Sequence, residues 1–330
     1  ENLFYRTVKR LEDAGELSKE TVFIDGTKLE ACANKYTFVW KKSVGKWEEK
    51  MLHKIQESVK LLNREYLQSF SVSPETRTQD LQDIVLFLEE RCRTESTFFV
   101  HGRGKRKSRN QRYFELFHRF LDRQTIYDWH TASFQGRNNY CKTDPDATFM
   151  HMKDDHMRNA QLKPGYNVQI AVDSEYIVAA DIFQDRNDVW TLVPFLKTME
   201  KNLEFRYPSV TADSGYESEE AYTYLRSAKQ KPYIKPQTYE KWKKRSFKQD
   251  ISKRENMGYD EKTDTYTCHA GKSLSPIFMK KQKSKSGYES EVTVYECEDC
   301  TDCPYKERCT KAKGNKRLYI SKSFLEKRQE

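Results

Sequence analysis

Hydrophobic residues follow two different periods along this chain of 330 residues. Between residues 46 and 130 they recur every three or four positions, which is the spacing of amphipathic helices. From residue 165 onward they form short alternating or β-branched runs, which is the pattern of strands. The sequence therefore predicts an α/β fold in which a helical segment interrupts a sheet.

The helical segment contains three predicted helices. The first covers residues 46–70, the second centres on 81–88, and the third covers 113–130. A basic stretch with two glycines, at 101–112, separates the second helix from the third. We expect this stretch to form a loop or hairpin arm with a strong positive charge.

Strand-like runs lie on both sides of the helical segment. The predicted strands are 21–24, 166–172, 176–183, 210–213 and 231–236. The second and third of them form a hairpin across a turn at 173–175. Helices are expected at 188–199, capped by Asp188, and at 219–229.

Two aspartates follow predicted strands. Asp25 and Asp213 each come directly after a short apolar or β-branched run, and Gly26 and Gly215 lie within two residues of them. If the two strands are neighbours, both carboxylates could bind one Mg²⁺, an ion that prefers oxygen ligands. A plain turn role is the alternative, because aspartate before glycine is common in turns.

The charge of the chain favours a polyanionic partner. It carries 59 Lys and Arg against 50 Asp and Glu, a formal net charge of +9. The basic arm would grip DNA phosphates without reading sequence through Arg103, Lys105, Arg106, Lys107, Arg109 and Arg112. A second basic set, Lys243, Lys244 and Arg245, lies beside Trp242 and suits a phosphate backbone, with a solvated linker as the alternative.

The compartment follows from what the sequence lacks. It has no run of about 18 apolar residues, and its first residues show no signal-peptide pattern, so we expect a cytoplasmic protein. The chain starts with Glu1 and ends in a helix-like stretch at 324–330, which predicts a fragment of a longer protein.

Four of the eight cysteines crowd into residues 297–309. Cys297, Cys300, Cys303 and Cys309 have the spacing of a tetrahedral thiolate site, and Cys268 offers a further ligand. In a reducing cytosol this pattern predicts a structural Zn²⁺ site. An iron–sulfur cluster and free thiols in a loop are the alternatives.

The stretch HMKDDHM at 151–157 also suggests a metal site. On a helix, however, His151 and Asp155 would share a face and His156 would not, so a complete site is not expected. We expect a helix edge or loop in which Lys153 and Arg158 contact DNA.

Four ordered stretches resemble those of bacterial insertion-sequence transposases with a DDE-type domain. They are FIDGTKLEACANKYTFVWKK (23–42), KTDPDATFMHMKDDHMRNAQLKPGYNVQIAVD (142–173), TADSGYES (211–218) and YECEDCTDCPYKERC (295–309). The resemblance implies an RNase H-like fold, with a mixed five-stranded sheet, flanking helices, a helical insertion and a Cys-rich insertion. It places Asp25 at the family's first acidic position, on the first strand, and Asp213 at the second, on the fourth strand.

The resemblance also implies an activity. Enzymes of this family hydrolyse a phosphodiester at each transposon end and join the freed 3′-hydroxyl to target DNA, using two Mg²⁺ or Mn²⁺ ions. The expected partner is double-stranded DNA, both transposon ends and target, bound by a homodimer in the bacterial cytosol in association with the nucleoid.

The family's third acidic residue is a Glu on a helix after the Cys-rich insertion. Neither Glu326 nor Glu330 matches its motif, so we expect it beyond Glu330 and expect this fragment not to transpose. The alternatives are a catalytically inactive or repurposed DNA- or metal-binding remnant, and a plain RNase H-like nuclease.

The patterns and the resemblance together predict five segments. They are the first core strand with its flanks (1–45), a helical insertion with the basic arm (46–145), the remainder of the catalytic core (146–237), a basic and Cys-rich, zinc-ribbon-like insertion (238–318), and the start of a C-terminal helical region (319–330).

Overall fold

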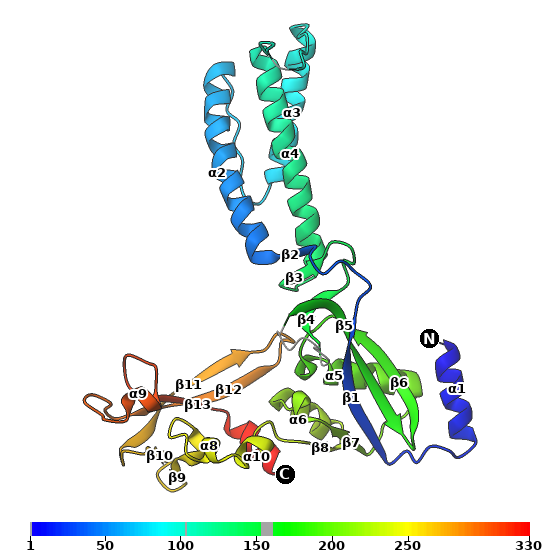
Figure 1. Cartoon of the computed structure of the whole chain (residues 1–330), viewed down its shortest axis with the longest axis vertical. Helices are drawn as coiled ribbons and strands as arrows, with labels where there is room; N and C mark the ends of the chain where they lie inside the picture. The colour runs from blue at the N-terminus through cyan, green and yellow to red at the C-terminus, as the bar shows by residue number, and fades with distance from the viewer. Residues whose placement is uncertain (1, 103, 153–160) are drawn as a thin grey trace. The chain divides into compact units, whose positions relative to one another are not determined.

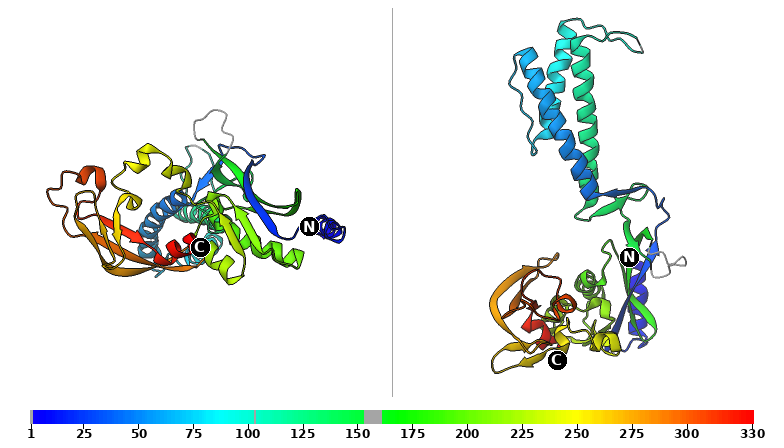
Figure 2. Two further views of the ribbon diagram at one scale, coloured as in Figure 1. Left: turned by 90° about the horizontal axis from the view of Figure 1, so that it is seen from below. Right: turned by 60° about the vertical axis from the view of Figure 1, so that its left-hand side comes forward.

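The computed structural model describes residues 2–102, 104–152 and 161–330. The chain forms two compact units (Figures 1 and 2). Unit 1 contains Glu1–Leu29 and Asn167–Glu330, and unit 2 contains Glu30–Tyr166. The chain therefore leaves unit 1, forms unit 2 and returns to complete unit 1.

A mixed sheet forms the centre of unit 1. Its strands are β1 (Thr21–Glu30), β5 (Leu162–Asp173), β6 (Tyr176–Phe183), β7 (Ser209–Ala212) and β8 (Lys231–Ile234). The order across the sheet is β6-β5-β1-β7-β8, in which β5 and β6 are antiparallel and β1, β7 and β8 are parallel. The predicted α/β class and the predicted hairpin of the second and third strands are confirmed.

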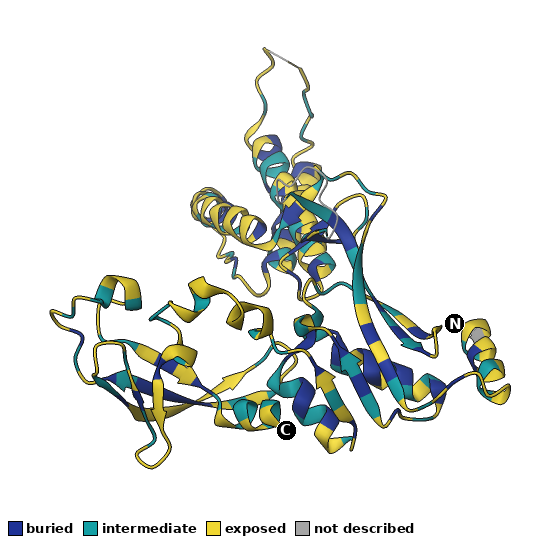
Figure 3. Cartoon of the chain, turned by 60° about the horizontal axis from the view of Figure 1, so that its bottom comes forward, coloured by how far each residue is buried: buried dark blue, intermediate teal, exposed yellow. Residues whose placement is uncertain are grey.

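Apolar side chains attach helices to this sheet. The helices are α1 (Asn2–Asp13), α5 (Leu192–Leu203) and α6 (Glu219–Ser227). Buried and exposed positions alternate along the start of β1 (Figure 3), where Val22 and Ile24 are buried and Phe23 is exposed. Val22 and Ile24 share one core with Phe195 and Met199 of α5, whose four-residue spacing puts them on one helix face.

Unit 1 contains a second sheet, which is antiparallel. Its strands are β9 (Gly258–Asp260), β10 (Thr265–Thr267), β11 (Ser273–Lys283), β12 (Glu289–Cys297) and β13 (Arg317–Ile320), in the order β13-β12-β11-β10-β9. Short helical segments accompany it: α7 (Tyr239–Trp242), α8 (Arg245–Lys248), η3 (Arg254–Asn256) and α9 (Lys306–Cys309). Tyr266, Leu274, Tyr295 and Leu318 are buried in its small core.

The last helix, α10 (Lys322–Gln329), packs on α6. The hydroxyl of Ser321 caps α10 by accepting from the amide of Phe324 at 3.2 Å, and it donates to Glu219 at 2.7 Å. Near the end of α10, Nε of Arg328 lies 2.8 Å from Oε1 of Glu217, and the two side chains are only 12% and 2% exposed. The second sheet is thereby tied to the helices of the first.

Three long helices form most of unit 2: α2 (Lys41–Tyr66), α3 (Arg77–Thr94) and α4 (Arg109–Phe134). They run side by side in Figures 1 and 2, and their core consists of apolar residues at helical spacing: Ile55, Leu62, Leu81, Ile84, Leu88 and Phe117. The three predicted helices are therefore confirmed. Unit 2 also contains the short strands β2 (Phe38–Trp40), β3 (Asn139–Cys141) and β4 (Thr148–His151).

The structure differs from the sequence predictions in three places. The main sheet has six strands, because β4 pairs with the start of β5 within unit 2. Strand β1 continues through Asp25 to Glu30, so Asp25 does not end it. Asp188 begins the 3₁₀ helix η1 (Asp188–Trp190), and the N-cap position of α5 belongs to Thr191. Backbone pairing extends β1 where its side chains no longer alternate in burial, which is why the pattern did not predict it.

The structure describes no helix that is both long and apolar enough to cross a membrane.

Replacing Glu217 with alanine should destabilise unit 1. The substitution leaves the guanidinium of Arg328 without its partner in a nearly dry environment, and breaking a buried ion pair in this way costs about 3–5 kcal/mol. Urea denaturation followed by circular dichroism measures the change.

The matched control is Glu291→Ala, which breaks a pair with Lys281 between side chains that are 60% and 77% exposed. Exposed pairs contribute little, so its free energy of unfolding should stay near that of the parent. Equal losses in the two variants would contradict the importance of the buried pair.

Candidate active site

The pairing of β1 with β7 places Asp25 beside Asp213. The two strands are parallel, and their last registered pair is Ile24 with Ala212. Each aspartate is the next residue, so Asp25 and Asp213 follow one another across neighbouring strands, whose backbones in a sheet lie about 4.8 Å apart. Both residues are exposed. The condition set by the sequence, that the two strands be neighbours, is met.

A buried tyrosine lies beside the aspartate pair. Tyr216, in the 3₁₀ helix η2 (Ser214–Tyr216), is 1% exposed and donates its hydroxyl proton to Oε1 of Gln169. Burial raises the pKa of Tyr216 far above its usual value, and the negative charges of Asp188, Asp25 and Asp213 raise it further. The phenol therefore stays neutral, and it lies close enough to all three carboxylates for their charges to act on it.

Asp188 is the third of these carboxylates. Its Oδ1 accepts from Nδ2 of Asn167 at 2.8 Å and from Nε2 of Gln169 at 3.4 Å. Nε2 of Gln169 also donates to Oδ1 of Asn167 at 2.9 Å. Both amide residues are fully buried on β5, and they hold the partly exposed carboxylate of Asp188 from the interior of the unit.

This role of Asp188 was not predicted from the sequence. A cap and a site residue look alike in a sequence, because both are aspartates just before a helix. The signal lay elsewhere, in Asn167 and Gln169, two polar residues at alternate positions of a strand that is otherwise apolar. Polar side chains on the buried face of a strand require partners, and Asp188 is that partner.

Two glycines allow the site to close. A Cβ at Gly26 would lie 2.5 Å from Nε2 of Gln169 and 2.9 Å from the hydroxyl of Tyr216. A Cβ at Gly215 would lie 3.1 Å from Oδ2 of Asp188. Gly26 is therefore needed for close packing beside Asp25, and Gly215 leaves little room for a side chain beside Asp188.

A cation stands near the pair. Lys235 follows β8, and its amide donates to the carbonyl of Ala212 at 3.2 Å. Its Nζ lies 2.9 Å from Oε1 of Glu240. The hydrogen bond to Glu240 raises the pKa of Lys235, and the charge of Asp213 adds to the effect.

The donor atoms of the site suit a hard cation. Asp25 and Asp213 are exposed and supply carboxylate oxygens, which Mg²⁺ prefers, and Mg²⁺ sites often use only one or two protein carboxylates. Over the described residues, no three His, Cys, Asp or Glu side chains are placed so that they could hold a metal ion together. The site is thus a pair of aspartates with Asp188 close by.

The cysteine cluster lines one small cavity of about 20 Å³ in the second sheet's region of unit 1. Cys268, Cys297, Cys300, Cys303 and Cys309 all reach this cavity, and all are free thiols. Burial raises the pKa of Cys297 to about 12, and the neighbouring Cys300 adds to the effect. The amide of Lys316 lies 3.3 Å from Sγ of Cys300. The structure therefore gathers the predicted ligand set, although not in the geometry of a bound ion.

The predicted DNA-contacting residues divide between the two units. Arg103, Lys153 and Arg158 lie outside the described residues, as do Asp154, Asp155 and His156, whereas His151 is exposed on β4. Lys105, Arg106 and Arg112 of unit 2 are exposed, Lys107 pairs with Glu115 at 2.5 Å, and Arg109 lies 5.0 Å from the ring centre of Tyr66. In unit 1, Lys244 and Arg245 are exposed, and Lys243 pairs with Glu240 at 3.2 Å.

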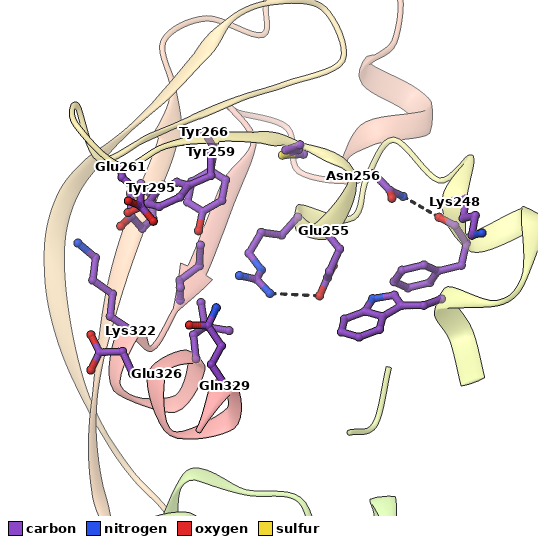
Figure 4. Close-up of a pocket in the computed structure, with 16 residues that line it drawn as sticks. Lys248, Glu255, Asn256, Tyr259, Glu261, Tyr266, Tyr295, Lys322, Glu326 and Gln329 are labelled. Atoms are coloured by element: carbon purple, nitrogen blue, oxygen red, sulfur yellow. Dashed lines mark hydrogen bonds and ion pairs between the residues drawn. The ribbon is translucent and has the colours of Figure 1, made fainter. Parts of the chain in front are cut away.

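A further pocket of about 760 Å³ lies in unit 1 between the second sheet, α8 and α10 (Figure 4). Its wall includes Tyr259, Tyr266 and Tyr295, together with an ion pair of Arg254 and Glu255 at 3.4 Å. Neither Asp25 nor Asp213 lines it. Because cations and carboxylates share its wall, the pocket shows no clear preference for an anion.

Part of the chain matches a known family. Residues 267–330 match the family described as "Transposase DDE domain". The matched region contains the cysteine cluster and α10, and it contains neither Asp25 nor Asp213. No curated protein and no solved structure matches the chain. The match supports a DDE-type transposase.

Replacing Gly26 with alanine should disturb the site and lower stability. The new methyl group would overlap Gln169 and Tyr216, which are buried and hydrogen-bonded to each other and cannot move freely. Overpacking of this kind costs about 1–3 kcal/mol. Chemical denaturation gives the free energy of unfolding.

Gly45→Ala provides a contrast of opposite sign. Gly45 lies inside α2, and a Cβ added there would have no neighbouring atom within 4 Å, so alanine should raise helix stability by about 0.5–1 kcal/mol. A Gly26→Ala variant as stable as the parent would contradict the close packing beside Asp25.

Proposed function

We propose that this chain is part of a DDE transposase whose aspartate pair, Asp25 and Asp213, binds divalent cations and cleaves DNA. One observation carries the proposal: the register of Ile24 with Ala212 makes Asp25 and Asp213 the next residues on two neighbouring parallel strands. The family match at residues 267–330, in the same unit of the structure, supports it independently.

The sheet supports an RNase H-like core. Counted along the chain within unit 1, β1 is the first strand and β7 the fourth; Asp25 lies on β1 and Asp213 directly follows β7. The resemblance in the sequence implies these strands for the first two acidic residues of the family. The mixed directions of the sheet and its flanking helices agree with the same core.

Mg²⁺, or Mn²⁺, is the proposed cofactor. Asp25 and Asp213 would hold it, and when bound it would stabilise the charge on the attacking and leaving oxygens of a phosphodiester. The residues of the chain supply the positioning. Asn167 and Gln169 fix Asp188 beside the pair, and the neutral phenol of Tyr216 occupies the dry side of the site.

Double-stranded DNA is the proposed partner, both as transposon ends and as target, with two copies of the chain acting together. The exposed cations Lys105, Arg106 and Arg112 of unit 2 and Lys244 and Arg245 of unit 1 would bind phosphates. Such contacts position a protein on DNA, and base contacts would be needed to select a particular end sequence.

Two other functions use the same core. A plain nuclease would cleave DNA with these aspartates without joining strands, and a repurposed remnant would bind DNA without cleaving it. Fold alone does not separate the three functions. Products of a reaction with labelled 3′-ends do separate them, because only the transposase joins an end to a second duplex.

Replacing either aspartate of the pair with asparagine should abolish cleavage. Asp25→Asn or Asp213→Asn removes one anionic ligand while keeping its size, so Mg²⁺-dependent nicking of a transposon-end duplex by the full-length protein should fall by more than about 100-fold. The measurement is the initial rate of nicking on a gel.

Glu175→Gln is the control, since Glu175 is an exposed carboxylate in the β5–β6 turn of the same sheet. That turn follows Asp173, which bonds Ser18 just before β1 and so lies at the other end of the sheet from Asp25. Nicking that survives in both aspartate variants would overturn the assignment of the pair.

We also propose that the cysteine cluster binds a structural Zn²⁺. Five thiols around one cavity give the soft donor set that Zn²⁺ accepts in tetrahedral sites. The cluster lies among β10, β12 and α9, so an ion there would fasten the loops of the second sheet.

Metal analysis of the purified protein should find about one zinc per chain. Cys300→Ser should lose the metal and lower the midpoint of thermal unfolding, because metal binding and folding are coupled. Cys32→Ser changes an exposed thiol outside the cluster and should retain the metal. A brown protein that contains iron would show that the cluster binds an iron–sulfur cluster instead of zinc. The absence of both metals would reject the metal site.

A further inference from the structure

A pocket of about 480 Å³ opens within unit 2. We call it the aromatic pocket. Its wall comes from β2, the start of α2, the second half of α4 and Lys142, and includes Phe38, Trp40, Trp47, Arg123, Tyr127 and Lys142. None of these residues belongs to the aspartate pair, the cysteine cluster or the two predicted DNA-contacting sets.

Two aromatic side chains of the aromatic pocket are strongly exposed. Trp47 is 58% exposed and Phe38 is 47% exposed. Removing large aromatic rings from water is favourable, and their faces favour contact with other planar groups. The pocket size falls in the range of small-ligand sites, about 300–1,000 Å³. The wall therefore suits a flat, planar ligand.

The same wall is positively charged. Arg123 and Lys142 both line it, and no Asp or Glu is among its described lining residues. The guanidinium of Arg123 lies 5.9 Å from the ring centre of Tyr127, and neither cation forms an ion pair with a carboxylate of the described chain. The cations are thus available to an anionic group of a ligand.

The pKa of His130 is affected by the same positive charges. Its Nδ1 is 2.5 Å from the hydroxyl of Tyr140, and it lines the aromatic pocket. Burial lowers the pKa of His130, and the positive charges of Lys142 and Arg123 lower it further. His130 therefore stays neutral near pH 7, and the positive charge in the pocket comes from Arg123 and Lys142.

We propose that the aromatic pocket binds an unstacked nucleotide of single-stranded DNA. The base would lie against Trp47 and Phe38, and its phosphate would meet Arg123 and Lys142. Aromatic rings beside cations are the pattern by which proteins hold single strands without selecting a sequence, because every base has a flat face. In a duplex the bases are stacked and paired, so the pocket would discriminate strand from duplex.

This proposal rests on the proposed function only in taking DNA as the partner. It requires neither the aspartate pair nor a metal ion. A single strand and a free nucleotide present the same chemistry, and the choice of the strand follows from the net charge of +9, which favours a polyanion over a single phosphate.

The test measures binding of the full chain to a fluorescent oligothymidine of about 12 nucleotides, by anisotropy in a buffer without added Mg²⁺ or Mn²⁺. Trp47→Ala should weaken binding about tenfold, and Trp47→Phe, which keeps an aromatic face, should restore most of it. Arg123→Gln should lower the slope of log affinity against log salt by roughly 0.7, the value for one phosphate of a single strand. Affinity for a duplex of equal length should change little in the Trp47 variants.

Trp129→Ala is the matched control, because Trp129 is 50% exposed on α4 and does not line the aromatic pocket. Equal losses in the Trp47→Ala and Trp129→Ala variants, or equal losses for strand and duplex, would overturn the proposal. Thymidine monophosphate that binds as tightly as the strand would show a free-nucleotide site instead. Since the binding assay needs no Mg²⁺ or Mn²⁺, these outcomes are independent of failure in the cleavage assay.

Discussion

The parallel pairing of β1 with β7 is the interaction on which the rest of unit 1 depends. It joins segments far apart in the sequence, as the hydrogen bond between the hydroxyls of Thr21 and Ser209, 188 positions apart, shows. All of unit 2 lies within this interval. Because the register ends at Ile24 and Ala212, it makes Asp25 of β1 and Asp213 after β7 the next residues on the two neighbouring strands. A shift of one residue would turn one aspartate to the other face of the sheet.

The polar network beneath the aspartates is stable only if every buried polar group in it is hydrogen-bonded. Asn167, Gln169 and Tyr216 are buried, and a buried polar group without a partner is strongly unfavourable. Each has its partner here, and the partners converge on Asp188 and on one another. Such a satisfied network specifies one arrangement of side chains, which apolar packing alone would not do. It therefore acts as a scaffold for an exposed pair of charges.

The second sheet belongs to the same unit as the aspartates through α10. The buried pair of Glu217 and Arg328 and the hydrogen bond of Ser321 to Glu219 connect the two parts. Glu217 follows Tyr216 in the chain, so this anchor begins next to the site itself. The family match covers the second sheet from Thr267, while the aspartates stand on the first. The packing of α10 on α6 therefore links the region of the family match physically to the sheet that carries Asp25 and Asp213.

The sequence by itself determined the elements whose signals are local. The helices of unit 2 follow from apolar residues at spacings of three and four, and the β5–β6 hairpin follows from alternation around the Asp173 turn. Asp25 and Asp213 could be proposed because each follows a strand-like run. Tertiary structure decided the rest: that β1 lies beside β7, that Asp188 joins the site rather than capping a helix, and that Trp47 and Arg123 share a pocket. Periodicity records how each residue is buried against its own neighbours, whereas strand order, register and pockets arise from contacts between distant residues, which no local pattern encodes.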